Sequence, residues 1–209
     1  MFSLSRINLS LFLVWLFHVS AVVGCLIGYC DWFTTKTPLN LLLISILVIL
    51  DHSSQRPFKV FIPFVMGMTA EWIGVHTGWL FGDYAYGSNL GWKCWEVPLL
   101  IGMNWLIMIY AGSALTSNTR WSRWLRAICT AVLITSLDIL MEQVAPKLDF
   151  WSFRNGVVPF SNYVGWLIVS FIAAWLYIGN EKEVRPSTLG VHIFFAILFY
   201  FVCINILLG

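Results

Sequence analysis

Residues 60–80 read VFIPFVMGMTAEWIGVHTGWL, an apolar stretch that holds a single carboxylic acid, Glu71. Asp138 and Glu142 lie inside a second such stretch, residues 124–144. An ionised carboxylate at the centre of a bilayer is costly, about 2.5–3.5 kcal/mol on insertion scales, so acids retained there indicate a function. The three acids therefore mark the candidate functional centre of the protein.

The composition is that of a membrane protein. Hydrophobic residues make up 59% of the 209-residue chain and charged residues 11%, with a mean hydropathy of +0.81, too few polar residues to cover a water-facing surface. The formal net charge of +2 is small and scattered, so we expect no nucleic-acid partner. The five cysteines lack CxxC spacing and the four histidines are far apart, which predicts neither a metal site nor a disulfide framework.

Seven apolar runs predict an all-α fold, a polytopic membrane helix bundle that forms a single integral membrane domain over residues 1–209. Most runs approach the ~20 residues that cross a ~30 Å hydrocarbon core. The second run is short, and we expect it to cross a thinned membrane or to re-enter. The predicted spans are residues 7–29, 38–50, 60–80, 98–115, 124–144, 158–178 and 189–208.

The basic residues predict the orientation in the cell membrane. The side that holds the amino terminus carries eight of them, namely Arg6, Arg56, Lys59, Arg120, Arg123, Arg126, Lys182 and Arg185. The other side carries four, namely Lys36, Lys93, Lys147 and Arg154. The positive-inside rule then places the amino terminus in the cytoplasm and the carboxy terminus outside.

Glu71 shares one helix face with three glycines. Gly67, Glu71, Gly74 and Gly78 are spaced i, i+4, i+7 and i+11, which lines them up along a single side of a helix. Small residues allow close helix contact within a membrane. We therefore expect Glu71 to point into the bundle and to take part in proton transfer.

Thr135, Asp138 and Glu142 are spaced i, i+3 and i+7 near the outer end of the fifth predicted span. Two neighbouring carboxyls repel each other when both are ionised, so we expect at least one to hold a proton near neutral pH. A buried carboxylic acid of this kind is suited to general acid catalysis. Asp138 lies deeper and is the predicted acid, with Glu142 modulating it. In the alternative interpretation, both acids only pair with Arg154, Lys147 or helix backbone near the interface.

Two loops rich in aromatic residues, 78–98 and 149–166, connect to these spans. Trp79, Trp92 and Trp95 are typical of an interfacial aromatic belt. Buried indole and amide groups need hydrogen-bond partners, so some other residues are better site candidates. Asn162 is the candidate that orients water, and His18 is the histidine most suited to a pocket. The candidate substrate-binding residues are Trp105, Trp166, Tyr84, Tyr86, Phe81 and Asn104.

The pattern E-x-x-G-x-x-T-G-x-x-F-G-x-Y-x-Y, from Glu71 to Tyr86, is followed by Val97-Pro98, Trp105, Asp138 and Pro159-x-x-Asn162-x-x-Gly165-Trp166. These residues resemble the membrane-embedded carotenoid biosynthesis proteins, over roughly residues 64–175. That family includes the gamma-carotene and bisanhydrobacterioruberin hydratases.

The resemblance implies a carotenoid 1,2-hydratase, a hydro-lyase that adds water to the terminal isopropylidene C1=C2 bond of an acyclic carotenoid end group. Such a reaction needs an acid, aromatic faces for a tertiary carbocation and one positioned water. It requires no cofactor and no metal. The expected partners are the carotenoid substrate and membrane lipid, with other carotenoid biosynthesis enzymes as further candidates.

Two other functions remain open from the sequence. Asp138-x-x-x-Glu142 is compatible with one magnesium–diphosphate motif of a membrane prenyltransferase, although such enzymes use two facing acidic motifs. A small transporter or carotenoid-binding protein could instead use Glu71 and Asp138 as a proton relay.

Overall fold

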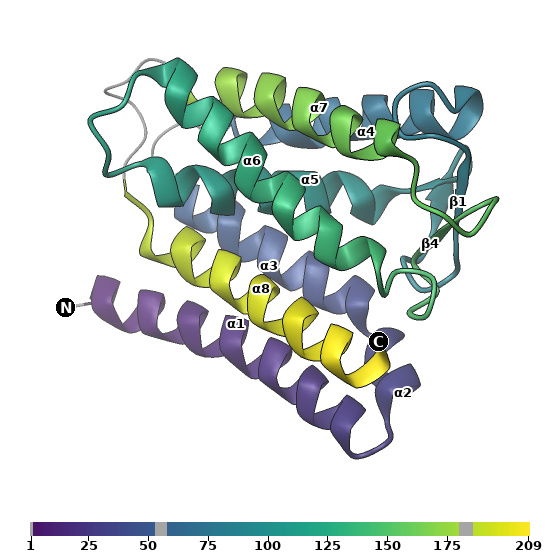
Figure 1. The fold of residues 1–209 in the computed structure, drawn as a ribbon. Helices are drawn as coiled ribbons and strands as arrows, with labels where there is room; N and C mark the ends of the chain where they lie inside the picture. The colour runs from purple at the N-terminus through teal and green to yellow at the C-terminus, as the bar shows by residue number, and fades with distance from the viewer. Residues whose placement is uncertain (1, 53–57, 180–185) are drawn as a thin grey trace.

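The computed structural model describes residues 2–52, 58–179 and 186–209, most of which are helical (Figure 1). Successive long helices run back and forth through one bundle, so the two ends of the chain lie at opposite ends of it (Figure 1). The long helices are α1 (Phe2–Leu26), α3 (Thr37–His52), α4 (Phe61–Thr77), α5 (Leu99–Thr116), α6 (Arg123–Glu142), α7 (Phe160–Ile178) and α8 (Thr188–Leu208). The predicted all-α membrane bundle is confirmed.

The helices differ in how well they match the bilayer. Five of the described helices, α1, α5, α6, α7 and α8, are long and apolar enough to cross a membrane by length and composition. Helix α3 has 16 residues and so extends about 24 Å, less than the ~30 Å core, which agrees with the short second span. Helix α4 has 17 residues and carries Glu71 on its buried side.

Local sequence sets several helix ends. The side chains of Ser122 and Ser187 cap α6 and α8, because each hydroxyl accepts a backbone N–H three residues on, at 3.3 and 3.0 Å. Gly78 ends α4 in the left-handed conformation, with φ 67°, that favours glycine. Helix α5 packs against α3, α4, α6, α7 and α8, and its sequence is apolar on all sides.

Two short antiparallel sheets, which the sequence did not predict, lie in the connections. Strand β1 (Tyr84–Tyr86) pairs with β4 (Trp151–Phe153), and β2 (Lys93–Cys94) pairs with β3 (Val97–Pro98). Sheet β1–β4 lies beside the ends of α4 and α6 (Figure 1). We call this end of the bundle the strand end.

A disulfide joins Cys25 to Cys30 in the turn between α1 and the short helix α2 (Cys30–Thr34). The expectation that the cysteines form no disulfide is wrong for this pair. Gly28, with φ 90°, reverses the chain there and brings the two cysteines together.

The orientation prediction is testable with fusions. We expect a reporter that works only outside the cytoplasm to be active after Gly209, because the bundle has its termini at opposite ends and fewer basic residues at the strand end. A cytoplasmic reporter should be active at the amino terminus or inserted at Thr119. A Gly209 fusion active only in the cytoplasm would reverse the orientation. Three of the counted basic residues, Arg56, Lys182 and Arg185, lie outside the described residues.

Candidate functional site

Glu71 accepts three side-chain hydrogen bonds inside the bundle. The hydroxyls of Tyr84 and Tyr86 donate to Oε2, each at 2.5 Å, and the indole N–H of Trp105 donates to Oε1 at 3.0 Å. The Glu71 side chain is only 3% exposed. Both oxygens of the Glu71 carboxyl group therefore have hydrogen-bond donors where water is scarce, as a buried polar group requires. The predicted inward orientation of Glu71 is confirmed.

The glycines of α4 make room for the rings around Glu71. A Cβ added at Gly67 would overlap the Trp105 ring, and one at Gly74 would lie 2.7 Å from Phe81 and 2.9 Å from Tyr84 Oη. The absence of side chains here is what allows aromatic rings to reach the carboxylate from α5 and from the loop after α4.

The second group of polar residues joins α6 to α7. The amide nitrogen of Asn162 donates to Asp138 Oδ2 at 3.1 Å and to Glu142 Oε1 at 2.9 Å. Trp151 Nε1 donates to Glu142 Oε2 at 2.9 Å. Asp138 is fully buried, and its Oδ1 has no hydrogen-bond partner within the described part of the chain. The amide of Asn162 thus holds two carboxyls at once.

The alternative pairing of Asp138 and Glu142 with basic residues is not what the structure has. Arg154 forms an exposed ion pair with Asp83, with 2.9 Å between Arg154 Nε and Asp83 Oδ2. Lys147 Nζ donates to the backbone carbonyl of Leu208. Both cations therefore act at the strand end, outside the buried site.

Sheet β1–β4 brings the two carboxyl groups' donors together. Tyr84 lies opposite Phe153 and Tyr86 opposite Trp151, and in each strand the first and third side chains are buried while the middle one is exposed. Tyr84 and Tyr86 bind Glu71, whereas Trp151 binds Glu142. One small sheet consequently supplies donors to carboxylates on two different helices.

The loops that carry these strands are joined at their bases. Ser88 donates from both its backbone N–H, at 2.9 Å, and its hydroxyl to Asp149 Oδ2. These hydrogen bonds hold the pKa of Asp149 below its ordinary value. The backbone N–H of Gly87 also donates to the carbonyl of Phe150 at 2.8 Å. The register of β1 against β4 is thereby reinforced just beyond the paired residues.

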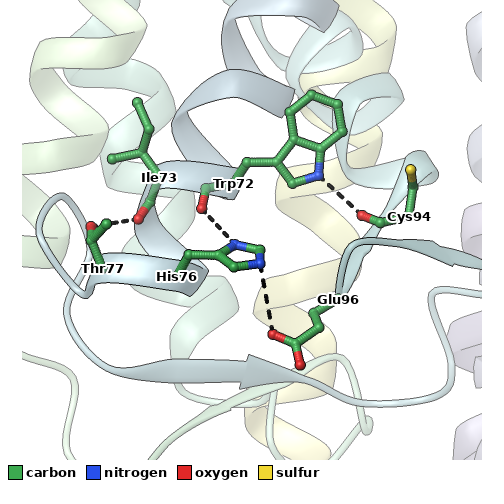
Figure 2. Close-up of polar contacts among 6 residues, drawn as sticks. All are labelled: Trp72, Ile73, His76, Thr77, Cys94 and Glu96. Carbon is green, nitrogen blue, oxygen red and sulfur yellow. Dashed lines mark hydrogen bonds and ion pairs between the residues drawn. The ribbon is translucent and has the colours of Figure 1, made fainter.

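The outward face of α4 holds the β2–β3 hairpin in place (Figure 2). Trp72 Nε1 donates to the carbonyl of Cys94 at 3.0 Å, and His76 Nδ1 donates to the carbonyl of Trp72 at 2.9 Å. His76 Nε2 lies 4.0 Å from Glu96 Oε2 (Figure 2). His76 therefore attaches the hairpin and does not belong to the buried carboxyl site.

A small cavity of about 10 Å³ lies between the two groups of polar residues. Glu71, Glu142 and Asn162 line it together with aromatic rings, and this volume is close to the lower limit for one water molecule. Trp166, on its wall, stacks on Trp105 with 4.3 Å between ring centroids and 11° between planes. We call this the carboxyl cavity.

The structure places the predicted site residues in three positions. Glu71, Glu142 and Asn162 line the carboxyl cavity with Phe81, Tyr84, Tyr86 and Trp166. Asp138 and Trp105 lie just behind its wall, where each binds a residue that lines it. Asn104 faces a different cavity, of about 630 Å³, which His18 also lines. Asn104 and Trp105 diverge because successive helical residues point about 100° apart.

Two aromatic residues of the carboxyl cavity, Trp151 and Phe153, were not among the predicted site residues. The signal that could have found them is the alternation Trp151-Ser152-Phe153, which matches Tyr84-Ala85-Tyr86 in the other loop. Three residues are too few for a periodicity to predict a strand without knowledge of its partner.

Fold and site together define a polytopic membrane protein with a buried, aromatic-lined carboxyl site at one end of a helix bundle. Residues 36–209 match the family described as "Carotenoid biosynthesis protein", and the chain belongs to this family. A curated relative is the bisanhydrobacterioruberin hydratase of Haloarcula japonica, 27% identical over 120 residues. That alignment covers 51% of this chain and 39% of the relative, so the chain spans well under two thirds of the relative's length. No solved structure matches the chain.

The glycine face of α4 gives a stability prediction. Gly67→Ala forces Trp105 away from Glu71, and overpacking of this kind lowers the free energy of unfolding by about 1–3 kcal/mol. Thr69→Ala, at an exposed position of the same helix, is the matched control and should change it by less than about 0.5 kcal/mol. The midpoint of thermal unfolding in detergent measures both. Equal midpoints would mean that the Gly67 contact has no role in stability.

Proposed function

We propose that the protein is a carotenoid 1,2-hydratase that adds water to the terminal isopropylidene C1=C2 bond of an acyclic carotenoid end group. The observation that carries this proposal is the carboxyl cavity, in which Glu71 and Glu142 share a water-sized space with aromatic rings. Membership of the carotenoid biosynthesis family and the name of the Haloarcula japonica relative support it. The product is a tertiary alcohol.

Glu142 is the better candidate for the acid that meets the substrate. It lines the carboxyl cavity, whereas Asp138, the acid expected from the sequence, lies behind Asn162. A general acid must come within hydrogen-bond reach of the atom that it protonates. In this proposal Asp138 is the second carboxyl of the pair and acts on Glu142 through the shared amide of Asn162.

The addition proceeds in two bond-forming steps. The carboxylic acid of Glu142 gives its proton to C2, where the alkene π electrons form the new C–H bond, and C1 becomes a tertiary carbocation. A water molecule then forms the C–O bond at C1, and one of its protons returns to the Glu142 carboxylate. The sum is one alkene plus one water to one alcohol. No electrons are exchanged with a redox partner, so the proposed reaction is cofactor-independent.

Glu71 and the rings stabilise the cation. Three donors satisfy the Glu71 carboxyl group. In this proposal Glu71 is ionised when the cation forms, because an anion fixed in a dry site stabilises a developing positive charge. The ring of Trp166 on the cavity wall adds cation–π attraction. The same aromatic lining limits access of further water to the cation.

The product test uses the whole chain in a host that makes acyclic carotenoids. We expect mass spectrometry to find carotenoids heavier by one or two water molecules, and reactions of the purified protein in H₂¹⁸O to carry the label in the new hydroxyl. Retention of carotenoid by the protein without any hydrated product, in cells or in detergent, would indicate a non-catalytic binding protein instead.

Substitution of each carboxyl identifies the acid. Glu142→Gln should lower the rate at least ~10²-fold, because an amide cannot protonate carbon, and Glu71→Gln at least ~10-fold. Asp138→Asn should retain part of the activity with an altered pH–rate profile. Glu96→Gln, at an exposed acid of the strand end, is the matched control and should leave the rate unchanged. Loss of activity in Asp138→Asn with activity kept in Glu142→Gln would return the role of acid to Asp138.

A further inference from the structure

We infer that the cavity of about 630 Å³ binds the long apolar chain of the carotenoid substrate and that Ile101 and Trp151 form the passage from it to the carboxyl cavity. The inference rests on the proposed function, because it concerns the part of the same substrate that does not react. We call this larger space the chain cavity.

The chain cavity lies between α1, α2, α3, α5, α6 and α8, at the strand-end half of the bundle. Its size falls within the range of about 300–1,000 Å³ that small-molecule sites have. Residues from α1 (Phe17, Ala21), α3 (Ile44), α5 (Ile107) and α8 (Ile197) line it. Six helices therefore contribute to the lining of one space. Of its described lining residues, Ile101 and Trp151 also line the carboxyl cavity.

The lining of the chain cavity suits a hydrocarbon. Aliphatic and aromatic side chains dominate it, and the ring of His18 meets Tyr200 edge-on at 6.2 Å. His18 Nδ1 already donates to the carbonyl of Val14 at 2.7 Å. A polyene gains little by leaving lipid for another apolar place, so its binding must come from close dispersion contacts and fit. Rigid rings and branched aliphatic side chains provide such contacts.

The chain cavity reaches the outer surface of the bundle. Among its lining residues, Leu16 on α1, Trp32 on α2 and Leu39 on α3 are 44%, 56% and 59% exposed. These three residues are apolar, and α1 and α3 are apolar helices, so we take this side to face lipid. Lys36, which is also exposed and lines the cavity, lies over the Trp32 ring at 5.2 Å at the strand end. A carotenoid dissolved in the membrane can therefore enter between α1 and α3 without crossing water.

The chain cavity adjoins the carboxyl cavity, so the polyene of the ligand lies in the first and its end group in the second. Ile101 and Trp151 line both cavities, and the indole N–H of Trp151 holds Glu142 Oε2 at 2.9 Å. A carotenoid whose polyene lies in the chain cavity thus contacts Trp151, the residue that positions Glu142. The carboxyl cavity, on the other side of Ile101 and Trp151, has only about 10 Å³ of free volume. The end group of the carotenoid therefore enters it by displacing these two side chains.

The experiment measures binding separately from turnover. Lycopene is achiral and gives no circular dichroism in micelles, whereas lycopene held in a chiral site gives a visible signal. We expect the purified full chain to induce this signal and Glu142→Gln to retain it. Ala21→Trp and Ile44→Trp, which fill the chain cavity, should reduce it at least ~10-fold. Val23→Trp and Ile46→Trp, on exposed faces of the same helices, are the matched controls and should retain it.

The outcomes separate this inference from the proposed function. Folded Ala21→Trp and Ile44→Trp proteins that bind lycopene as well as the unmodified chain does would overturn the inference, and so would an unmodified chain that induces no signal. Hydration that persists in both variants would also overturn it while leaving the proposed function intact. Specific binding that both variants lose, without any hydrated product from the unmodified chain, would support the chain cavity and refute the hydratase.

Discussion

The constraint on which the rest of the structure depends is that a carboxylate inside a membrane must receive hydrogen bonds from the protein. Glu71 receives three, and their donors come from a helix and from a strand in a connecting loop. Meeting this requirement places Tyr84, Tyr86 and Trp105 around one side chain. The glycines of α4, the packing of α5 and the existence of sheet β1–β4 all serve that arrangement. Aromatic residues therefore have a double use here, since their polar atoms satisfy the acid and their rings keep the surroundings dry.

Much of the fold could be predicted from the sequence because the thickness of the bilayer sets the length of an apolar run that crosses it. The seven predicted spans correspond to the seven long helices among the described residues, of which five are long and apolar enough to cross a membrane. The inward orientation of Glu71 followed from glycine spacing. The strands and the Cys25–Cys30 disulfide could not be predicted, because they depend on which loop meets which after the helices have packed.

The sequence named many of the residues that lie at the site, but it did not show which of them line the cavity. Helical spacing grouped Asp138 with Glu142, and in the structure both accept from the amide of Asn162. The need for hydrogen-bond partners singled out Trp105, whose indole donates to Glu71. The position of an acid along its own helix does not reveal which side chain of a neighbouring helix separates it from the cavity. Asn162 comes from α7 and lines the cavity, whereas Asp138, to which it donates, does not. Asn104 lines a separate space. Trp151 was missed because its importance arises only from its register with Tyr86.

Sheet β1–β4 couples the two carboxyl groups mechanically. Each acid is anchored on a helix but takes a donor from a strand, and the two strands are hydrogen-bonded to each other. A displacement of either strand must therefore disturb the solvation of both acids in the same movement. A movement that separates α4 from α6 therefore also changes the hydrogen bonds that stabilise Glu71 and Glu142.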